Sequence, residues 1–193
     1  MAKKESTFGN MLMALLLISL MASTTLGFVY EFTKEPIRMV EINKTNSAIQ
    51  AVVPAFDNQP ATESFKVASD PDSLRFYPAK KNGELVGTAV ETYTKKGFSG
   101  LIKLMIGFAP DGEIIDIIVL SHQETPGLGD KIDKKKSDFS LQFQGKNPAS
   151  FKLSVKKDRG DVDAITASTI SSRAYCDAVK RAYDVYMNSV KKP

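Results

Sequence analysis

The feature that most constrains this chain is an uncharged stretch near its N-terminus. Residues 8–30 read FGNMLMALLLISLMASTTLGFVY, rich in Leu and Met and without a charged side chain. A helix needs about 20 such residues to cross a bilayer, so we expect a transmembrane anchor. Lys3 and Lys4 precede it, and positive charge ahead of a span keeps that end in the cytoplasm. The sequence therefore predicts a single-pass protein of the inner (cytoplasmic) membrane, with residues 1–7 in the cytoplasm and residues 31–193 on the extracytoplasmic (periplasmic) side.

A cleaved signal peptide is the alternative interpretation of the same stretch. Small residues near Met21 offer a cleavage site, but the apolar run continues to Phe28 and Val29, further than the core of a usual signal. A buried core helix would show polar residues along one side, and this stretch does not. We therefore predict that the anchor is retained in the mature protein.

The composition limits the chemistry of the rest of the chain. A length of 193 residues suggests one domain beside the anchor. The single Cys and the single His, Cys176 and His122, exclude a disulfide framework and argue against a transition-metal site. Lys and Arg total 26 against 22 Asp and Glu, but no aromatic residues alternate with the lysine runs as they do in nucleic-acid-binding surfaces. We expect no nucleic-acid partner, while a weak attraction to acidic partners or an anionic membrane surface stays open.

The exported region has the pattern of an α+β fold, in which an antiparallel sheet is flanked by helices. An early helix is expected over residues 33–53, with Thr33 as its cap, Pro36 in its first turn and Pro54 after its end. The polar stretch from residue 58 to residue 72 reads as a loop.

Strand patterns dominate the middle of the chain. Hairpin turns are predicted at residues 81–83 and 110–112, where Asn-Gly and Asp-Gly separate apolar runs. FKLSVKK, residues 151–157, alternates and predicts a further strand. The last element is predicted to be a helix that begins near Ser172 and buries a stripe formed by Tyr175, Ala178, Val179, Ala182, Tyr186 and Val190.

The segment before this last helix is crowded with hydroxyl groups and reads DAITASTISS from Asp163 to Ser172. Hydroxyls just ahead of a helix accept hydrogen bonds from its free N–H groups. The same N–H groups and the helix dipole form an anion site. Thr169, Ser171 and Ser172 can therefore cap the helix or hold a phosphate. Spacing alone favours capping, although capping does not need so many hydroxyls.

A second loop of interest, ETPGLG, covers residues 124–129. Gly127 and Gly129 permit backbone conformations that are closed to other residues, and they let main-chain N–H groups approach a flat ligand. An ordinary tight turn helped by Pro126 is the alternative.

Together and in this order, the two loops resemble those of the FMN-binding domain in the G subunit of the Rnf electron-transport complex. The C subunit of the sodium-pumping NADH:quinone oxidoreductase shares this domain. The resemblance covers nearly the whole chain: the anchor, GFSGLIKLMIGF, HQETPGLGDKI, FQGK and the terminal helix. It implies the α+β fold of that domain and an FMN that is held covalently, with its phosphate esterified to a threonine.

The attachment pattern of the family, roughly Asp-x-x-Ser/Thr-Gly-Ala-Thr, aligns with residues 163–169, where Asp163, Thr166 and Thr169 match it. The resemblance therefore implies that Thr169 is the covalent FMN phosphoryl threonine. Ala167 stands where Gly is usual, and Ser168, which stands where Ala is usual, is a rival acceptor. Lys131 would stabilise the negative charge of the reduced flavin. An ordinary solvated lysine is the alternative interpretation. The full set of further cofactor-binding residues implied by the resemblance is Asp163, Thr166, Ser168, Ser172, Glu124, Thr125, Gly127, Leu128, Gly129 and Lys131.

The resemblance also implies a function. A membrane-anchored flavoprotein would relay electrons within a multisubunit ion-translocating oxidoreductase that works between ferredoxin and NAD. The flavin would carry the electrons, so no side chain is expected to act as acid, base or nucleophile. The implied partners are the other subunits, the membrane and a flavin transferase that attaches the FMN. The alternatives are the C subunit of the quinone reductase, an anchored module of this fold without redox function, and a regulatory FMN-binding domain.

Overall fold

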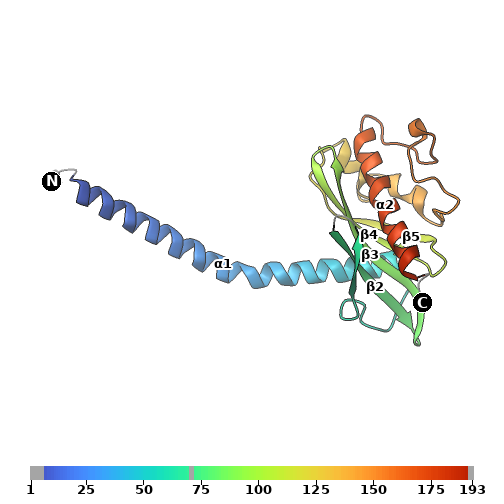
Figure 1. The fold of residues 1–193 in the computed structure, drawn as a ribbon, viewed down its shortest axis with the longest axis horizontal. Coiled ribbons are helices and arrows are strands. Elements are labelled where there is room, and N and C mark those ends of the chain that lie inside the picture. Colours follow the sequence, from blue (N-terminus) through green and yellow to red (C-terminus); the bar gives the residue numbers. More distant parts are fainter. Residues whose placement is uncertain (1–6, 70–71, 191–193) are drawn as a thin grey trace. The chain divides into compact units, whose positions relative to one another are not determined.

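The computed structural model describes residues 7–69 and 72–190. The chain divides into two compact units at the junction of Asn43 and Lys44. The first unit is a helical segment, and the second is a five-stranded sheet with helices packed on it (Figure 1). Lys3 and Lys4, on which the expected membrane orientation depends, lie outside the described residues.

Helix α1 runs without interruption from Phe8 to Val52. The expectation of a separate helix capped by Thr33 is wrong, because the Thr33 hydroxyl donates to the carbonyl oxygen of Val29 at 2.9 Å in the middle of α1. Pro36 lies inside the helix. A proline inside a helix removes one backbone hydrogen bond and crowds the preceding turn, yet α1 continues on both sides of Pro36. The end of the helix just before Pro54 is as predicted.

The N-terminal part of α1 is long and apolar enough to cross a membrane, and no other helix in the described part of the chain meets that test. Its large apolar side chains, from Phe8 to Ile42, are exposed. The hydroxyls of Thr24 and Thr25 donate to helix carbonyl oxygens at 2.7 and 2.8 Å. Polar groups that face lipid need such internal partners, so the helix is suited to a bilayer.

The sheet is an antiparallel meander in which every strand pairs with its neighbour in sequence. Both predicted hairpins are confirmed. Asn82 and Gly83 have φ of 53° and 84°, as the two central residues of a type I′ turn require. The strands are β1 (Phe65–Ser69), β2 (Asp72–Lys81), β3 (Glu84–Gly97), β4 (Gly100–Phe108) and β5 (Ile114–Ser121).

Strand β1 corrects the expectation that residues 58–72 form a loop. It pairs with the first half of β2, and the ring of Phe65 stacks on that of Phe76 with centroids 5.5 Å apart. This strand is short and lies at the edge of the sheet, so most of its residues stay accessible and its sequence shows no strong alternation.

The stretch FKLSVKK is also different from the prediction, because it forms no strand. Val155 makes an isolated bridge with Val162, and the short 3-10 helix η3 (Lys156–Asp158) follows directly. Backbone and carboxylate groups of Asp161 pair with Lys152 instead, which folds the segment back on itself. Leu153 and Val155 are nevertheless buried. The alternation of apolar and polar residues therefore indicates which side chains are buried, although the segment is irregular.

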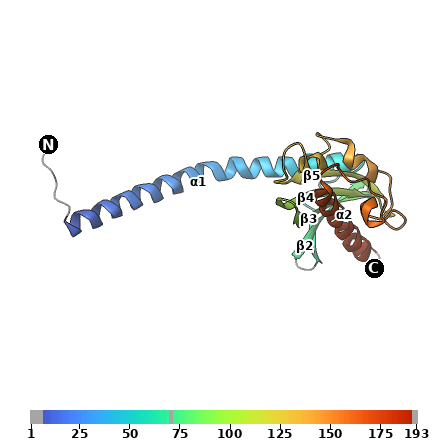
Figure 2. The same cartoon turned by 90° about the horizontal axis from the view of Figure 1, so that it is seen from above.

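Helix α2 (Thr169–Val190) lies on one face of the sheet, over β3 and β4 (Figures 1 and 2). It begins three residues before the predicted start. The predicted stripe is confirmed for the side chains that are described: Tyr175, Ala178, Val179, Ala182 and Tyr186 are all fully buried. The other face of the sheet packs against the end of α1 through Ala48, Ile49 and Val52.

Between β5 and α2 the chain is mostly irregular. It contains two further 3-10 helices, η1 (Gly129–Ile132) and η2 (Asp138–Phe143), which contact each other and the sheet side of α2. Rings from η2 pack against Tyr175 of α2, with Phe139 and Phe143 each 5.2 Å from it between centroids. This packing holds the two loops of interest beside the start of α2.

Candidate cofactor site

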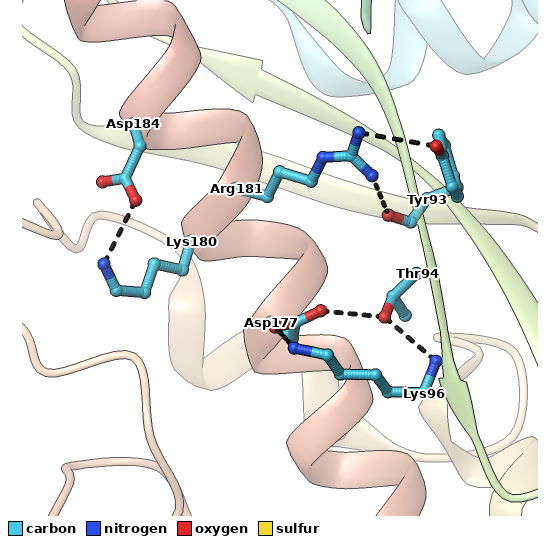
Figure 3. Close-up of polar contacts among 7 residues, drawn as sticks. All are labelled: Tyr93, Thr94, Lys96, Asp177, Lys180, Arg181 and Asp184. Atoms are coloured by element: carbon cyan, nitrogen blue, oxygen red, sulfur yellow. Dashed lines mark hydrogen bonds and ion pairs between the residues drawn. The ribbon is translucent and has the colours of Figure 1, made fainter. Parts of the chain in front are cut away.

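Polar contacts fix the position of α2 along β3 (Figure 3). The carboxylate of Asp177 accepts from the Thr94 hydroxyl at 2.9 Å and from the Lys96 ammonium at 2.6 Å. One turn further along, the guanidinium of Arg181 lies over the ring of Tyr93, 4.4 Å from its centroid. Such partly exposed contacts add little stability one by one. Together they define the register of the helix, and so the place of its first residue.

The hydroxyl groups at the start of α2 divide into two sets, and the serines form the inner one. Ser168, Ser171 and Ser172 are buried. The Ser168 hydroxyl donates to Oγ of Ser171 at 2.9 Å. The Ser172 hydroxyl donates to the carbonyl oxygen of Ser168 and accepts from the N–H of Ile165, both at 3.0 Å. These bonds tie the segment before the helix to its first turn, although none of them is a cap in which a hydroxyl accepts from a free N–H group of α2.

The threonines form the outer set. Thr166 is exposed, and Thr169, the first residue of α2, is half-buried. Neither threonine hydroxyl forms a hydrogen bond with another described residue. The first N–H groups of a helix have no partners within it and carry partial positive charge. Thr169 therefore stands where a phosphate group is favoured.

The backbone at Ala167 separates the two sets. Ala167 has φ of 61°, in the left-handed region. This conformation costs an L-residue about 1–2 kcal/mol, and glycine adopts it freely. The residue lies between Thr166, which is exposed, and Ser168, which is buried. Its conformation therefore changes the direction of the chain just before α2 begins. Glycine, the residue that the family pattern places at this position, is the one that suits it.

We expect Ala167→Gly to stabilise the protein by about 0.5–1 kcal/mol. The variant removes the left-handed penalty of about 1–2 kcal/mol and loses part of that gain to the greater freedom of glycine in the unfolded chain. Urea unfolding followed by circular dichroism measures the difference. Ala164→Gly is the matched control, because Ala164 is exposed and has no positive φ; it should lose stability. Loss of stability in both variants would contradict the conformation of Ala167.

The Gly-rich loop presents one side to solvent. Thr125, Gly127 and Leu128 are exposed, Leu128 to 43%. Gly127 has φ of 76°, and a Cβ built there would meet nothing within 4 Å. The carbonyl oxygen of Thr125 accepts from the N–H groups of Leu128 and Asp130 at 3.2 and 3.3 Å, which holds the turn closed. The loop therefore offers open backbone and one apolar side chain to a flat ligand.

Glu124 and Gly129 lie on the inner side of this loop. Glu124 is only 4% exposed. Its Oε2 accepts from the Ser171 hydroxyl, and its Oε1 accepts from the N–H of Ser99 at 3.0 Å. A Cβ at Gly129 would lie 2.6 Å from Oε2 of Glu124 and 2.8 Å from Oγ of Ser171. The structure thus brings the two loops into contact at the first turn of α2.

Asp163 is held through its backbone, and its side chain points outward. Its N–H donates to Oε1 of Gln142 at 2.7 Å, and Nε2 of Gln142 donates to its carbonyl oxygen at 3.2 Å. The carboxylate forms an exposed ion pair with Lys156 at 2.8 Å. Sequence reasoning missed Gln142, because no motif distinguishes one glutamine in FSLQFQGK. Lys131 is half-buried and forms no ion pair with another described residue.

The ionisable groups along α2 serve the fold. Arg173 contacts both carboxylate oxygens of Asp158 at 2.7 Å; the guanidinium lowers the pKa of Asp158, and the carboxylate raises the pKa of Arg173. Burial raises the pKa of the Cys176 thiol to about 12 and that of Tyr175 well above its usual value. The described residues contain no group of His, Cys, Asp or Glu side chains that could hold a metal ion.

Comparison with known proteins identifies the family. The sequence model described as an FMN-binding domain matches residues 97–184. The G subunit of an ion-translocating oxidoreductase complex from Shewanella piezotolerans is 37% identical over 98% of this chain and 93% of its own length. The chain belongs to this G-subunit family. Relatives of the same name are 37% identical in Vibrio atlanticus, over 90% of this chain and 88% of the relative, and 33% identical in Haemophilus influenzae, over 89% and 86%.

The matched FMN-binding domain contains the whole candidate site of this member of the G-subunit family. It begins at Gly97, beside the turn that carries Ser99, and it includes the Gly-rich loop and most of α2. The apolar part of α1 precedes it, yet the relatives match that part as well, since they align with nearly the whole chain. The resemblance drawn from the two loops is thereby confirmed at the level of the family.

Proposed function

We propose that this member of the G-subunit family is a membrane-anchored flavoprotein whose FMN is esterified through its phosphate to Thr169. The observation that carries the proposal is the placement of Thr169. Its hydroxyl has no partner among the described residues, and it stands at the first position of α2, where a negative charge is favoured. The rival acceptor, Ser168, is buried with its hydroxyl bonded to Ser171. This difference favours the threonine.

The Gly-rich loop is the proposed contact for the flavin ring. The open backbone at Gly127 and the exposed side chains of Thr125 and Leu128 suit a flat ring that is tethered nearby. Lys131 follows this loop, and we assign it to the stabilisation of negative charge on the reduced ring. Asp163 and Thr166 belong to the segment that the transferase must accept. FMN supplies the redox chemistry, and the residues of this chain bind and orient it without an acid–base step of their own.

The names of the relatives support a wider proposal. They are subunits of ion-translocating oxidoreductase complexes, so we place this chain as an electron relay within such a complex, of the Rnf type that works between ferredoxin and NAD. Other subunits would be its direct partners and would form the ion pathway, since a single spanning helix cannot enclose one. A separate flavin transferase would make the phosphoester at Thr169. The globular region, residues 31–193, would lie on the periplasmic side of the inner membrane, with residues 8–30 spanning it and residues 1–7 in the cytoplasm.

The anchor proposal predicts how truncated forms behave. We expect a fragment that begins at Lys44 to be soluble without detergent, and the full chain to need it. The exposed apolar side chains of α1 continue as far as Ile42. A fragment that begins at Thr33 keeps Ile37, Met39 and Val40 and should be less soluble than the shorter one. Gel filtration and sedimentation compare the three forms. A full chain that stays monomeric without detergent would contradict the anchor.

The mass of the intact protein, purified from its native membrane, tests the proposed cofactor. A mass increased by one FMN group less one water molecule, with flavin fluorescence that survives denaturation, is the expected result. Protein produced beside the transferase that gains neither mass nor fluorescence would overturn the flavoprotein assignment and favour a non-redox module of this fold.

A further inference from the structure

One buried carboxylate joins three segments of the candidate site. Glu124 belongs to the Gly-rich loop, and its oxygens accept from the N–H of Ser99 in the β3–β4 turn and from the hydroxyl of Ser171 in the first turn of α2. Ser168 extends the chain of hydroxyls by donating to Ser171. We call the contacts among Glu124, Ser171 and Ser99 the Glu124 clasp.

The carboxylate has little freedom to move. A Cβ at Gly97 would lie 2.6 Å from Oε1 of Glu124, and a Cβ at Gly129 would lie 2.6 Å from Oε2. Both glycines therefore bring bare backbone against the carboxylate. A buried carboxylate is tolerated only where hydrogen bonds and positive potential replace water. The clasp supplies the hydrogen bonds, and the start of α2 supplies the potential.

The carboxylate and the proposed attachment hydroxyl lie on different sides of α2. Successive residues of a helix are rotated by about 100°, so Thr169 and Ser171 point in nearly opposite directions. Ser171 is 1% exposed and bonded to Glu124, whereas Thr169 is half-buried and has no hydrogen bond to another described residue. The hydrogen bonds of Glu124 go to Ser171 and Ser99 and not to Thr169, so we expect its effect on a group at Thr169 to pass through the helix.

We infer that Glu124 is the positioning residue of the proposed flavin site, and not a ligand of the flavin as the family resemblance implied. A flavin tethered at Thr169 and contacted by Thr125, Gly127 and Leu128 needs a fixed distance between helix and loop. The clasp sets that distance, because the same carboxylate holds both segments. This inference deepens the proposed function and rests on it, but its first test needs no flavin.

The first test is hydrogen exchange in the full chain without flavin, solubilised in detergent. In Glu124→Gln, the hydrogen-bonded amides of Leu128 and Asp130 in the loop and of residues 172–175 in α2 should both exchange about tenfold faster, the effect of losing one charge-assisted hydrogen bond. Exchange in β2 should stay unchanged. Glu91→Gln is the control for the lost charge, because the amide oxygen of Gln can still accept from the Tyr77 hydroxyl, which Glu91 binds at 3.0 Å on the other face of the sheet. Faster exchange in only one of the two segments, or in neither, would overturn the inference.

The second test uses the flavin-loaded protein and separates position from charge. Ser171→Ala removes one arm of the clasp and leaves the carboxylate in place. Positioning predicts that Ser171→Ala and Glu124→Gln both shift the flavin midpoint potential, and that the double variant shifts it less than the sum of the two. A shift in Glu124→Gln alone would mean a purely electrostatic effect and would refute the clasp. If wild-type protein carries no flavin, the proposed function fails, while the exchange experiment still decides whether the clasp exists.

Discussion

Replacing Thr169 by alanine should abolish covalent attachment of FMN and leave the fold intact. The hydroxyl of Thr169 forms no hydrogen bond with another described residue, and Ser168 provides the polar contacts that precede the helix. The substitution therefore removes the proposed acceptor without removing a cap, and alanine suits a helix better than threonine does. We expect stability to change by less than about 0.5 kcal/mol, as for surface sites without special contacts. Flavin fluorescence on a denaturing gel, with the transferase co-expressed, measures attachment.

Two further variants control this result. Ser168→Ala should keep the flavin while it loses about 1 kcal/mol of stability, because it removes the buried hydrogen bond from the Ser168 hydroxyl to Ser171. Asp163→Ala should slow the installation of the flavin, since Asp163 matches the attachment pattern and its side chain is exposed to an approaching enzyme. A fluorescent Thr169→Ala band would exclude Thr169 as the acceptor. Loss of fluorescence in Ser168→Ala alone would move the site by one residue.

Replacing Gly107 by alanine should cost at least about 3 kcal/mol, near the upper end of overpacking in a core. A Cβ at Gly107 would lie 1.7 Å from the carbonyl oxygen of Val52 and 2.6 Å from its carbonyl carbon. Both atoms are backbone, so no side-chain rotation relieves the clash. The end of α1 must then move away from β4 and expose Ile49 and Val52, which are now buried.

The free energy of unfolding of this variant, measured with a denaturant, is best compared with that of Gly87→Ala. A Cβ at Gly87 would lie 3.2 Å from the carbonyl oxygen of Phe108 and 3.3 Å from side-chain atoms of Ile115 and Pro54. These contacts are tight but can relax by a few tenths of an ångström, so the cost should be clearly smaller. Equal losses in the two variants would show that the end of α1 does not pack against Gly107.

The fold was predictable where one residue type or one period determined local geometry. Asn82 and Gly83 indicated their turn, and the stripe on α2 followed from helical spacing. Periodicity failed at β1, a short edge strand, and at residues 151–157, where alternate side chains are buried without a strand. The prediction of a helix cap at Thr33 was wrong for another reason. A cap residue begins a helix only if the preceding residues do not already form one, and here the apolar segment does.

The candidate site was predictable only as a set of residues. The resemblance named both loops, but the sequence could not show that the serines point inward and the threonines outward. That division depends on the left-handed backbone of Ala167 and on tertiary contacts with Glu124. Gln142 and Ser99 act through contacts far apart in sequence, for which neither residue carries a local signal.

The order of elements along the chain has a consequence for how the molecule matures. Each strand pairs with the one before it, so the sheet can be completed as soon as the chain has been synthesised as far as Ser121, the end of β5. The clasp instead joins Glu124 to Ser171 across 47 positions, and closing so long a loop must wait until α2 has docked. We therefore expect the candidate site to assemble after the sheet. A flavin installed there would mark chains that have finished folding.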